Sequence, residues 1–140
     1  MQRMKFVTAL VLAGMAAPAF AQAPPMLPPA QLDQLVSRIA LYPDPLVAQI
    51  LAAASYSDQI QPAAQWADQH HYLAGQQLAN AITGDQLPWD PSVQALLPFP
   101  QVLELMARDM GWTQKLGDAV LAQRGDVMDA VQRIDRKSVV

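Results

Sequence analysis

The segment Leu41-Tyr42-Pro43-Asp44-Pro45-Leu46-Val47-Ala48-Gln49-Ile50-Leu51 joins two apolar patterns through a short turn bounded by prolines. Pro43 disfavours helical backbone at the residue before it, so a helix is predicted to end at Tyr42. Asp44 then occupies the place of an N-cap, and Pro45 the first helical position, where a missing N–H costs no hydrogen bond. The sequence therefore predicts a helix, an abrupt corner and a second helix.

The residues on both sides of this corner have the spacing of amphipathic helices. The apolar positions before it are Leu32, Leu35, Val36, Ile39 and Tyr42. Those after it are Leu46, Val47, Ile50, Leu51 and Ala54. Each set falls on one face of a helix. The chain is also rich in Ala, Leu, Gln and Val and has no long alternating run, a balance that favours helix over strand.

The same signals predict six further helices along the chain. Capping residues, prolines and glycines place them at about residues 57–69, 73–83, 91–97, 99–110, 113–124 and 126–134. In this scheme Ser57 or Asp58, Thr113 and Asp126 are caps, while Gly84, Gly111 and Gly125 stop helices. The predicted fold class is all-α, a compact array of about eight short helices with Asp-Pro corners.

The Asp-Pro corner has an echo 46 residues later, in residues 87–97, with Trp-Asp-Pro in place of Pro-Asp-Pro. At that offset six residues match: Leu41, Asp44, Pro45, Val47, Leu51 and Trp66 correspond to Leu87, Asp90, Pro91, Val93, Leu97 and Trp112. A duplicated multi-helix unit would produce such a period. The alternative is that Asp-Pro pairs recur at helix starts in any helical protein.

The first 21 residues have the pattern of a secretory signal peptide. Arg3 and Lys5 precede an apolar run at residues 6–17, and small residues follow up to Ala21. The run is shorter than the ~20 apolar residues that span a bilayer. We expect cleavage after Ala21 and a periplasmic or secreted protein without stable membrane insertion; an N-terminal membrane anchor is the alternative.

The remaining chain divides into three parts. Residues 22–31 hold four prolines and predict an extended, mobile linker, because proline is excluded from helix interiors and lacks a sheet donor. Residues 32–134 form the predicted helical domain. The codons that can encode residues 135–140 include those of a common sequencing-library adapter, so we expect this tail to be non-native and the natural domain to be truncated there.

Composition excludes several classes of function. Residues 22–134 carry eleven acidic and five basic side chains, a net charge of −6. Nucleic acids and anionic membranes need clustered cations, so neither is an expected partner. The chain has no Cys, which excludes disulfides, thiolate nucleophiles and Cys-based metal sites.

Two groups of titratable residues are candidates for chemistry. Asp44 and Asp90 each precede a proline, where backbone N–H groups and the helix dipole favour the ionised form, so capping is a better interpretation than acid catalysis. His70 and His71, with Asp68, are candidates for a weak metal site. Adjacent helical residues point about 100° apart, however, and a helix C-terminus favours cationic imidazole for structural reasons.

Aromatic residues are the remaining candidates for binding. A groove for a sugar or a peptide could be lined by Trp66, Trp89, Trp112, Tyr42, Tyr56 and Phe99. Core packing is the alternative, because these rings carry the largest apolar area in a small domain. No Ser lies in a nucleophile-elbow context and no Gly-rich phosphate loop occurs. The sequence therefore predicts no catalytic residue, cofactor or metal ligand.

The ordered motifs resemble the bacterial exported domain of unknown function 3300. They are Ile39-Ala40-Leu41-Tyr42-Pro43-Asp44-Pro45-Leu46, Ala48-Gln49-Ile50-Leu51-Ala52-Ala53, Trp89-Asp90-Pro91-Ser92-Val93, Phe99-Pro100-Gln101-Val102-Leu103, Trp112-Thr113 with Leu116-Gly117-Asp118-Ala119, and Asp126-Val127-Met128-Asp129-Ala130-Val131-Gln132-Arg133. The resemblance implies no activity, cofactor or catalytic residue. It implies a signal peptide, and often a tail rich in Tyr, Pro, Trp, Gly and His that this chain lacks.

Three functions follow as hypotheses. The first is a non-enzymatic cell-envelope module, with a helical binding or structural role, that binds an envelope protein or a wall polymer. The second is a wall-directed hydrolase that uses Asp44, Asp90 or His71. The third is metal binding through His70 or His71.

Overall fold

The computed structural model describes residues 26–138, and every regular element in that range is an α-helix. The helices are α1 (Pro29–Val36), α2 (Asp44–Ala54), α3 (Ser57–Gln69), α4 (Gly75–Gly84), α5 (Pro91–Gln94), α6 (Pro100–Arg108) and α7 (Met110–Ser138). The all-α prediction is confirmed. The described range has seven helices instead of the predicted eight, because the last two predicted helices are joined in α7.

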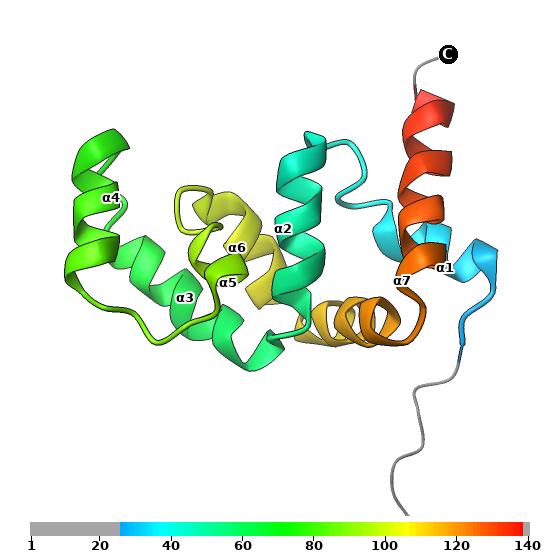
Figure 1. Ribbon diagram of the computed structural model, residues 1–140, viewed down its shortest axis with the longest axis horizontal. Helices are drawn as coiled ribbons and strands as arrows, with labels where there is room; N and C mark the ends of the chain where they lie inside the picture. The colour runs from blue at the N-terminus through cyan, green and yellow to red at the C-terminus, as the bar shows by residue number, and fades with distance from the viewer. Residues whose placement is uncertain (1–25, 139–140) are drawn as a thin grey trace, which may run out of the picture.

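Helix α7 is the last helix of the described chain and packs against α1, the first. It has two arms, residues 110–122 and 124–138, which meet at Gln123, where the backbone leaves the helical region (φ −150°, ψ 56°). Helix α1 packs mainly on α7, α2 packs on α7 and α5, and α3 packs on α6. Figure 1 shows α2 near the centre, α4 at one extremity, and α1 beside the second arm of α7 at the other.

One aliphatic core joins these helices. Its fully buried side chains include Leu32, Val36, Ile39, Ile50, Ile60, Leu96, Leu103, Met106, Leu116 and Val127. These are the inward positions of the amphipathic patterns, and each contributes roughly 1.5–3 kcal/mol when fully buried. Helix α4 is the exception, since it has no buried residue and no extensive contact with another described helix.

The corner between α1 and α2 differs from its prediction by one residue. The N-cap of α2 is Pro43, whose carbonyl accepts hydrogen bonds from the N–H groups of Leu46 and Val47. Asp44 is the first helical residue, is exposed, and makes no side-chain cap hydrogen bond. The predicted capping role of Asp44 is therefore wrong, although its charge still lies favourably in the first turn of the helix.

The second Asp-Pro corner has the predicted cap. Asp90 Oδ2 accepts hydrogen bonds from the backbone N–H of Ser92 at 2.9 Å and from its hydroxyl at 2.6 Å. These bonds hold the pKa of the Asp90 carboxyl below its ordinary value, and a hydrogen bond from Tyr56 adds to the effect. Helix α5 nevertheless has 4 residues, against 11 in α2, so the two corners start unlike helices and lend the duplication no support.

The predicted breaks in the C-terminal region lie elsewhere. Gly111 does not stop a helix but lies in the first turn of α7, and the break comes at Gln123, not at Gly125. The cap of α7 is Asp109, whose Oδ1 accepts from the N–H of Trp112 at 3.0 Å. Thr113, predicted as a cap, is buried and donates its hydroxyl to the carbonyl of Met106 at 2.7 Å.

Other boundaries shift by a few residues. Helix α1 begins at Pro29, inside the predicted linker of residues 22–31, and it ends at Val36, from which hydrogen-bonded turns continue to Tyr42. Tyr56 precedes α3 without a side-chain cap. Helix α4 begins at Gly75, whose φ of 57° is the left-handed region that glycine tolerates best. The predicted signal peptide lies outside the described residues.

Gly117 sets the distance between α7 and α2. A Cβ atom at this position would lie 2.2 Å from the carbonyl oxygen of Ala54 and 2.7 Å from its carbonyl carbon. Both are backbone atoms, so no side chain can move aside to make room. Any residue larger than glycine must therefore separate the two helices.

We predict that Gly117→Ala destabilises the protein by about 1–3 kcal/mol or more, the range for overpacking a closely packed contact. Urea unfolding followed by circular dichroism measures the change. Gly125→Ala is the matched control in the same helix, because nothing lies within 4 Å of its added Cβ. The control should be neutral or stabilising, by up to about 1 kcal/mol. Equal stability of the two variants would contradict the close-approach interpretation.

A partly buried ion pair joins α1 to the second arm of α7. The Arg133 guanidinium donates to Asp33 Oδ1 from Nε at 3.0 Å and from Nη2 at 2.7 Å. These hydrogen bonds lower the pKa of the Asp33 carboxyl, and the charges of Arg133 and Lys137 lower it further. A carboxyl whose folded pKa is depressed stabilises the fold above its unfolded pKa of about 3.9.

We predict that Asp33→Asn lowers the unfolding midpoint at pH 7, and that the difference from the wild type disappears as the pH falls below about 4. The stabilisation is lost in that direction because the wild-type carboxyl becomes protonated as the pH passes through its depressed folded value. Thermal unfolding between pH 2.5 and pH 7 measures it. Asp58→Asn, at an exposed position of α3, is the control. A pH-independent difference would refute the ion-pair interpretation.

Candidate binding groove

An open groove of about 810 Å³ lies between α1 and the first arm of α7. Its floor is apolar, formed by Leu35, Trp112 and Ala119. Its rims are polar and carry charges of both signs. The rim residues are Gln31, Gln34 and Arg38 on the α1 side, and Asp109, Lys115 and Asp118 on the α7 side. Leu27 and Gly111 complete the lining.

Helical periodicity produces each wall. Gln31, Gln34 and Arg38 are spaced by three and four residues, and so are Gly111, Lys115 and Asp118. Residues at that spacing share one helix face. The two walls face each other because α1 and α7 pack side by side. The apolar face of α1 is buried in the core, and the polar residues next to that face form the α1 rim of the groove.

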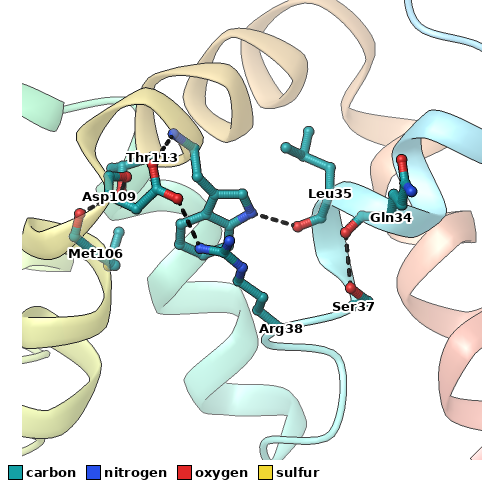
Figure 2. A network of polar contacts seen from close by, with 8 residues as sticks. Gln34, Leu35, Ser37, Arg38, Met106, Asp109 and Thr113 are labelled. Atoms are coloured by element: carbon teal, nitrogen blue, oxygen red, sulfur yellow. Dashed lines mark hydrogen bonds and ion pairs between the residues drawn. The ribbon is translucent and has the colours of Figure 1, made fainter.

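Trp112 fixes the two walls relative to each other. Its indole Nε1 donates a hydrogen bond of 2.7 Å to the carbonyl of Leu35, near the end of α1 (Figure 2). The side chain is only 8% exposed, so this bond lies in a buried environment. A buried carbonyl without a donor costs about 1–3 kcal/mol. Trp112 therefore supplies a donor that the end of α1 needs.

Arg38 lies against the same indole. Its guanidinium carbon is 5.2 Å from the centre of the Trp112 ring, within the range of a cation–π contact. Its Nη1 donates to Asp109 Oδ2 at 3.1 Å, and Figure 2 shows the two side chains meeting beside the ring. Both are nearly half exposed, so the ion pair adds little stability. Its main effect is to hold the guanidinium in place.

The charge of Asp109 is set by its surroundings. The backbone N–H of Trp112 lowers the pKa of the Asp109 carboxyl, and the hydrogen bond from Arg38 lowers it further. The residue is therefore an anion at neutral pH, occupied by two donors. A carboxylate held in this way is a poor general acid.

The predicted catalytic candidates do not meet in this groove. Neither Asp44, Asp90 nor His71 lines it. Asp44 is exposed at the start of α2, and the ionised Asp90 is engaged by Ser92. The charge of Asp90 in turn raises the pKa of the Tyr56 hydroxyl. The arrangement of Asp90 thus agrees with capping.

The two histidines are held by separate backbone carbonyls. Nδ1 of His70 lies 2.7 Å from the carbonyl oxygen of Trp66, and Nδ1 of His71 lies 2.7 Å from that of Asp68. The His70 ring stacks on the Trp66 indole, with centroids 3.9 Å apart. In residues 26–138 no three His, Asp or Glu side chains gather in a way that could hold a metal ion. Nδ1 of each imidazole is thus engaged with a backbone carbonyl, and metal binding by His70 or His71 stays untested.

Of the aromatic candidates, Trp112 alone lines the groove, and it is largely buried there. Trp66 is equally buried, and Tyr42 and Trp89 pack against the core. Tyr56 and Phe99 are partly exposed elsewhere. Sequence reasoning missed Arg38 and Asp109, which are 71 residues apart, and the glutamines of the rim. No local pattern marks these residues, because packing of α1 against α7 brings them together.

We predict that Trp112→Phe destabilises the fold by about 1–3 kcal/mol more than Trp66→Phe, because it leaves the buried Leu35 carbonyl without a donor. Trp66 is a matched control with the same exposed fraction. Its indole Nε1 donates to Asp85 Oδ2 at 2.8 Å, and that acceptor is 48% exposed and can be hydrated instead. Urea unfolding measures both variants. Equal losses would contradict the special role of the Leu35 bond.

Comparison with known proteins confirms the resemblance given by the motifs. Residues 28–139 match the family described as "Protein of unknown function (DUF3300)". Over 125 residues the chain is 44% identical to "Uncharacterized protein YacH" of Escherichia coli (strain K12). That match covers 84% of this chain but 20% of the relative, so the chain spans about one fifth of that protein's length. No solved structure shows significant similarity.

The C-terminal tail and the absence of stable membrane insertion are two further predictions from the sequence. The family match includes residues 135–139, within the predicted non-native tail, and the origin of that tail stays a prediction. Among the helices of residues 26–138, none combines the length and hydropathy needed to cross a membrane. The motifs, the family match and the relative agree, and the chain belongs to the DUF3300 family.

Proposed function

We propose that this protein is an exported, non-enzymatic module of the cell envelope that binds an envelope protein or a wall polymer in the groove between α1 and α7. The groove carries this proposal. Its volume of about 810 Å³ suits a ligand segment, its floor is apolar, and its rims offer amides and charges. The proposed export rests on the signal-peptide pattern of residues 1–21.

The groove is pre-formed for binding. Trp112 is fixed by its bond to Leu35, and Arg38 is held over the indole by Asp109. Fixed side chains lose little conformational freedom on binding, which favours affinity. The groove offers no nucleophile paired with a base, and the alternative of a wall-directed hydrolase gains no support from it.

The test is a titration of the ¹⁵N-labelled processed chain with soluble wall fragments and with peptides from digested periplasmic proteins. We predict chemical-shift changes at groove residues and binding at least 10-fold weaker in Arg38→Ala, because the variant loses the ordered guanidinium. Arg108→Ala is the control, since Arg108 pairs with Glu104 on the surface of α6 and does not line the groove.

Two results would contradict the proposal. One is the absence of shifts in the groove with every probe. The other is equal binding by the Arg38 and Arg108 variants. Export is tested separately by cell fractionation and by the mass of the processed chain, which should begin at Gln22. A chain that stays in the cytoplasm with residues 1–21 attached would refute the envelope location.

A further inference from the structure

We propose that two copies of this chain form a dimer by exchanging the second arm of α7, residues 124–138. In the dimer α7 is straight, and its second arm packs on α1 of the other copy instead of on its own. This inference goes beyond the proposed function and does not depend on what the groove binds. It is carried by a break of one residue between two helical arms that have different packing partners.

The break in α7 is confined to Gln123, which has φ −150° and ψ 56° between two helical arms. Figure 1 shows the two arms meeting at a corner. The helix contains no proline, and Leu121, Ala122 and Arg124 are residues compatible with helix. A Cβ atom added at Gly125 would meet nothing within 4 Å, so no close contact requires glycine there. A change of φ and ψ at Gln123 would therefore join the arms into one continuous helix.

The first arm of α7 is fixed to its own copy. The backbone of Gly117 lies directly against that of Ala54 at the end of α2. Trp112 donates its indole N–H to the Leu35 carbonyl of α1, and residues 37–43 join α1 closely to α2. These elements stay together when the second arm leaves. The groove between α1 and the first arm is consequently kept within each copy of the dimer.

The second arm has contacts that another copy can supply. Its buried apolar residues are Val127, Ala130 and Val131. Arg133 on the same arm donates two hydrogen bonds to Asp33 of α1. A second copy presents the same α1 with the same carboxylate, so the exchanged interface repeats the one inside a single chain. Exchange of an identical element is a low-cost route to a dimer for this reason.

The amide of Gln123 holds the bent form. Its Oε1 accepts from the Leu27 N–H at 2.7 Å, and its Nε2 donates to the Leu27 carbonyl at 3.2 Å. A straight α7 gives up this pair, and backbone groups at the break join the helical hydrogen bonds instead. Because hydrogen bonds replace hydrogen bonds, the concentration of the protein decides which form is populated.

A straight α7 also brings two exposed apolar residues onto one face. Leu121 is 70% exposed and Met128 is 38% exposed, and they belong to different arms. They are seven residues apart, which places them on the same side of a continuous helix, about two turns from each other. Two straight α7 helices that pass each other can cover this face. The dimer thus offers a partner for Leu121, which stays exposed in residues 26–138.

The first test measures the mass of the processed chain by light scattering after size exclusion, from micromolar to millimolar concentration and after refolding at the highest concentration. We expect a dimer whose share rises with concentration. Arg124→Pro should stay monomeric, because proline is excluded from a helix interior but tolerated at the first position of the second arm. Gln123→Ala should raise the association constant about 10-fold or more, since it removes the Leu27 bonds of the bent form.

The second test reverses charges. Asp33→Arg and Arg133→Asp each place like charges together within one chain and within a dimer of identical copies. When the two variants are mixed and refolded, both contacts of an exchanged dimer pair opposite charges. We expect the mixed dimer, identified by native mass spectrometry, to exceed each dimer of identical copies about 10-fold or more. The double variant Asp33→Arg/Arg133→Asp, which restores the pair within one chain, is the control and should behave as the wild type.

Three results would overturn the exchange. One is the absence of dimer both in the wild type at every concentration and in the mixture of charge variants. Another is a mixture in which the mixed dimer does not exceed the others. The third is a dimer formed equally well by Arg124→Pro, which would indicate docking of bent chains. Circular dichroism checks that the proline variant and the double variant are folded.

Discussion

The backbone of α7 lies directly against the end of α2 at Gly117 and Ala54, and most of the architecture follows from that contact. With the two backbones this close, Leu116 and Val120 on α7 reach the core that Ile50 and Leu51 supply from α2. The position of α7 then determines where α1 packs, and so determines the groove. A change at Gly117, which does not itself line the groove, can thus alter the shape of the groove.

The sequence predicts the helices better than their ends. Apolar spacing identifies the buried faces, because the inward residues of a helix repeat with a fixed period whatever packs against them. Helix ends depend on competing partners. Asp44 is a residue type that often caps helices, but the N-cap of α2 is Pro43, one residue earlier. Asp90 is the same residue type and does cap α5, because it accepts hydrogen bonds from both the N–H and the hydroxyl of Ser92.

The C-terminal region shows why glycine alone does not define a break. Gly111 and Gly125 both continue as helix, while the break falls at Gln123. At this break the side-chain amide of Gln123 accepts a hydrogen bond from Leu27, near the other end of the described chain, which is a contact that no local pattern shows. Likewise Thr113 is drawn inward by the Met106 carbonyl of α6. The contacts across the groove also join residues 71 and 77 positions apart, so local sequence patterns cannot show it.

The pairing of α1 with α7 has a consequence for the order of folding. The N-terminus of a chain leaves the ribosome first. The apolar face of α1 therefore leaves the ribosome well before the second arm of α7 that packs on it. Asp33 on α1 and its partner Arg133 on α7 are 100 residues apart. Until then Leu32, Leu35, Val36 and Ile39 have no α7 to cover them. The domain is consequently completed only near the end of its synthesis, and the emerging chain presents an apolar helix face that a chaperone can hold.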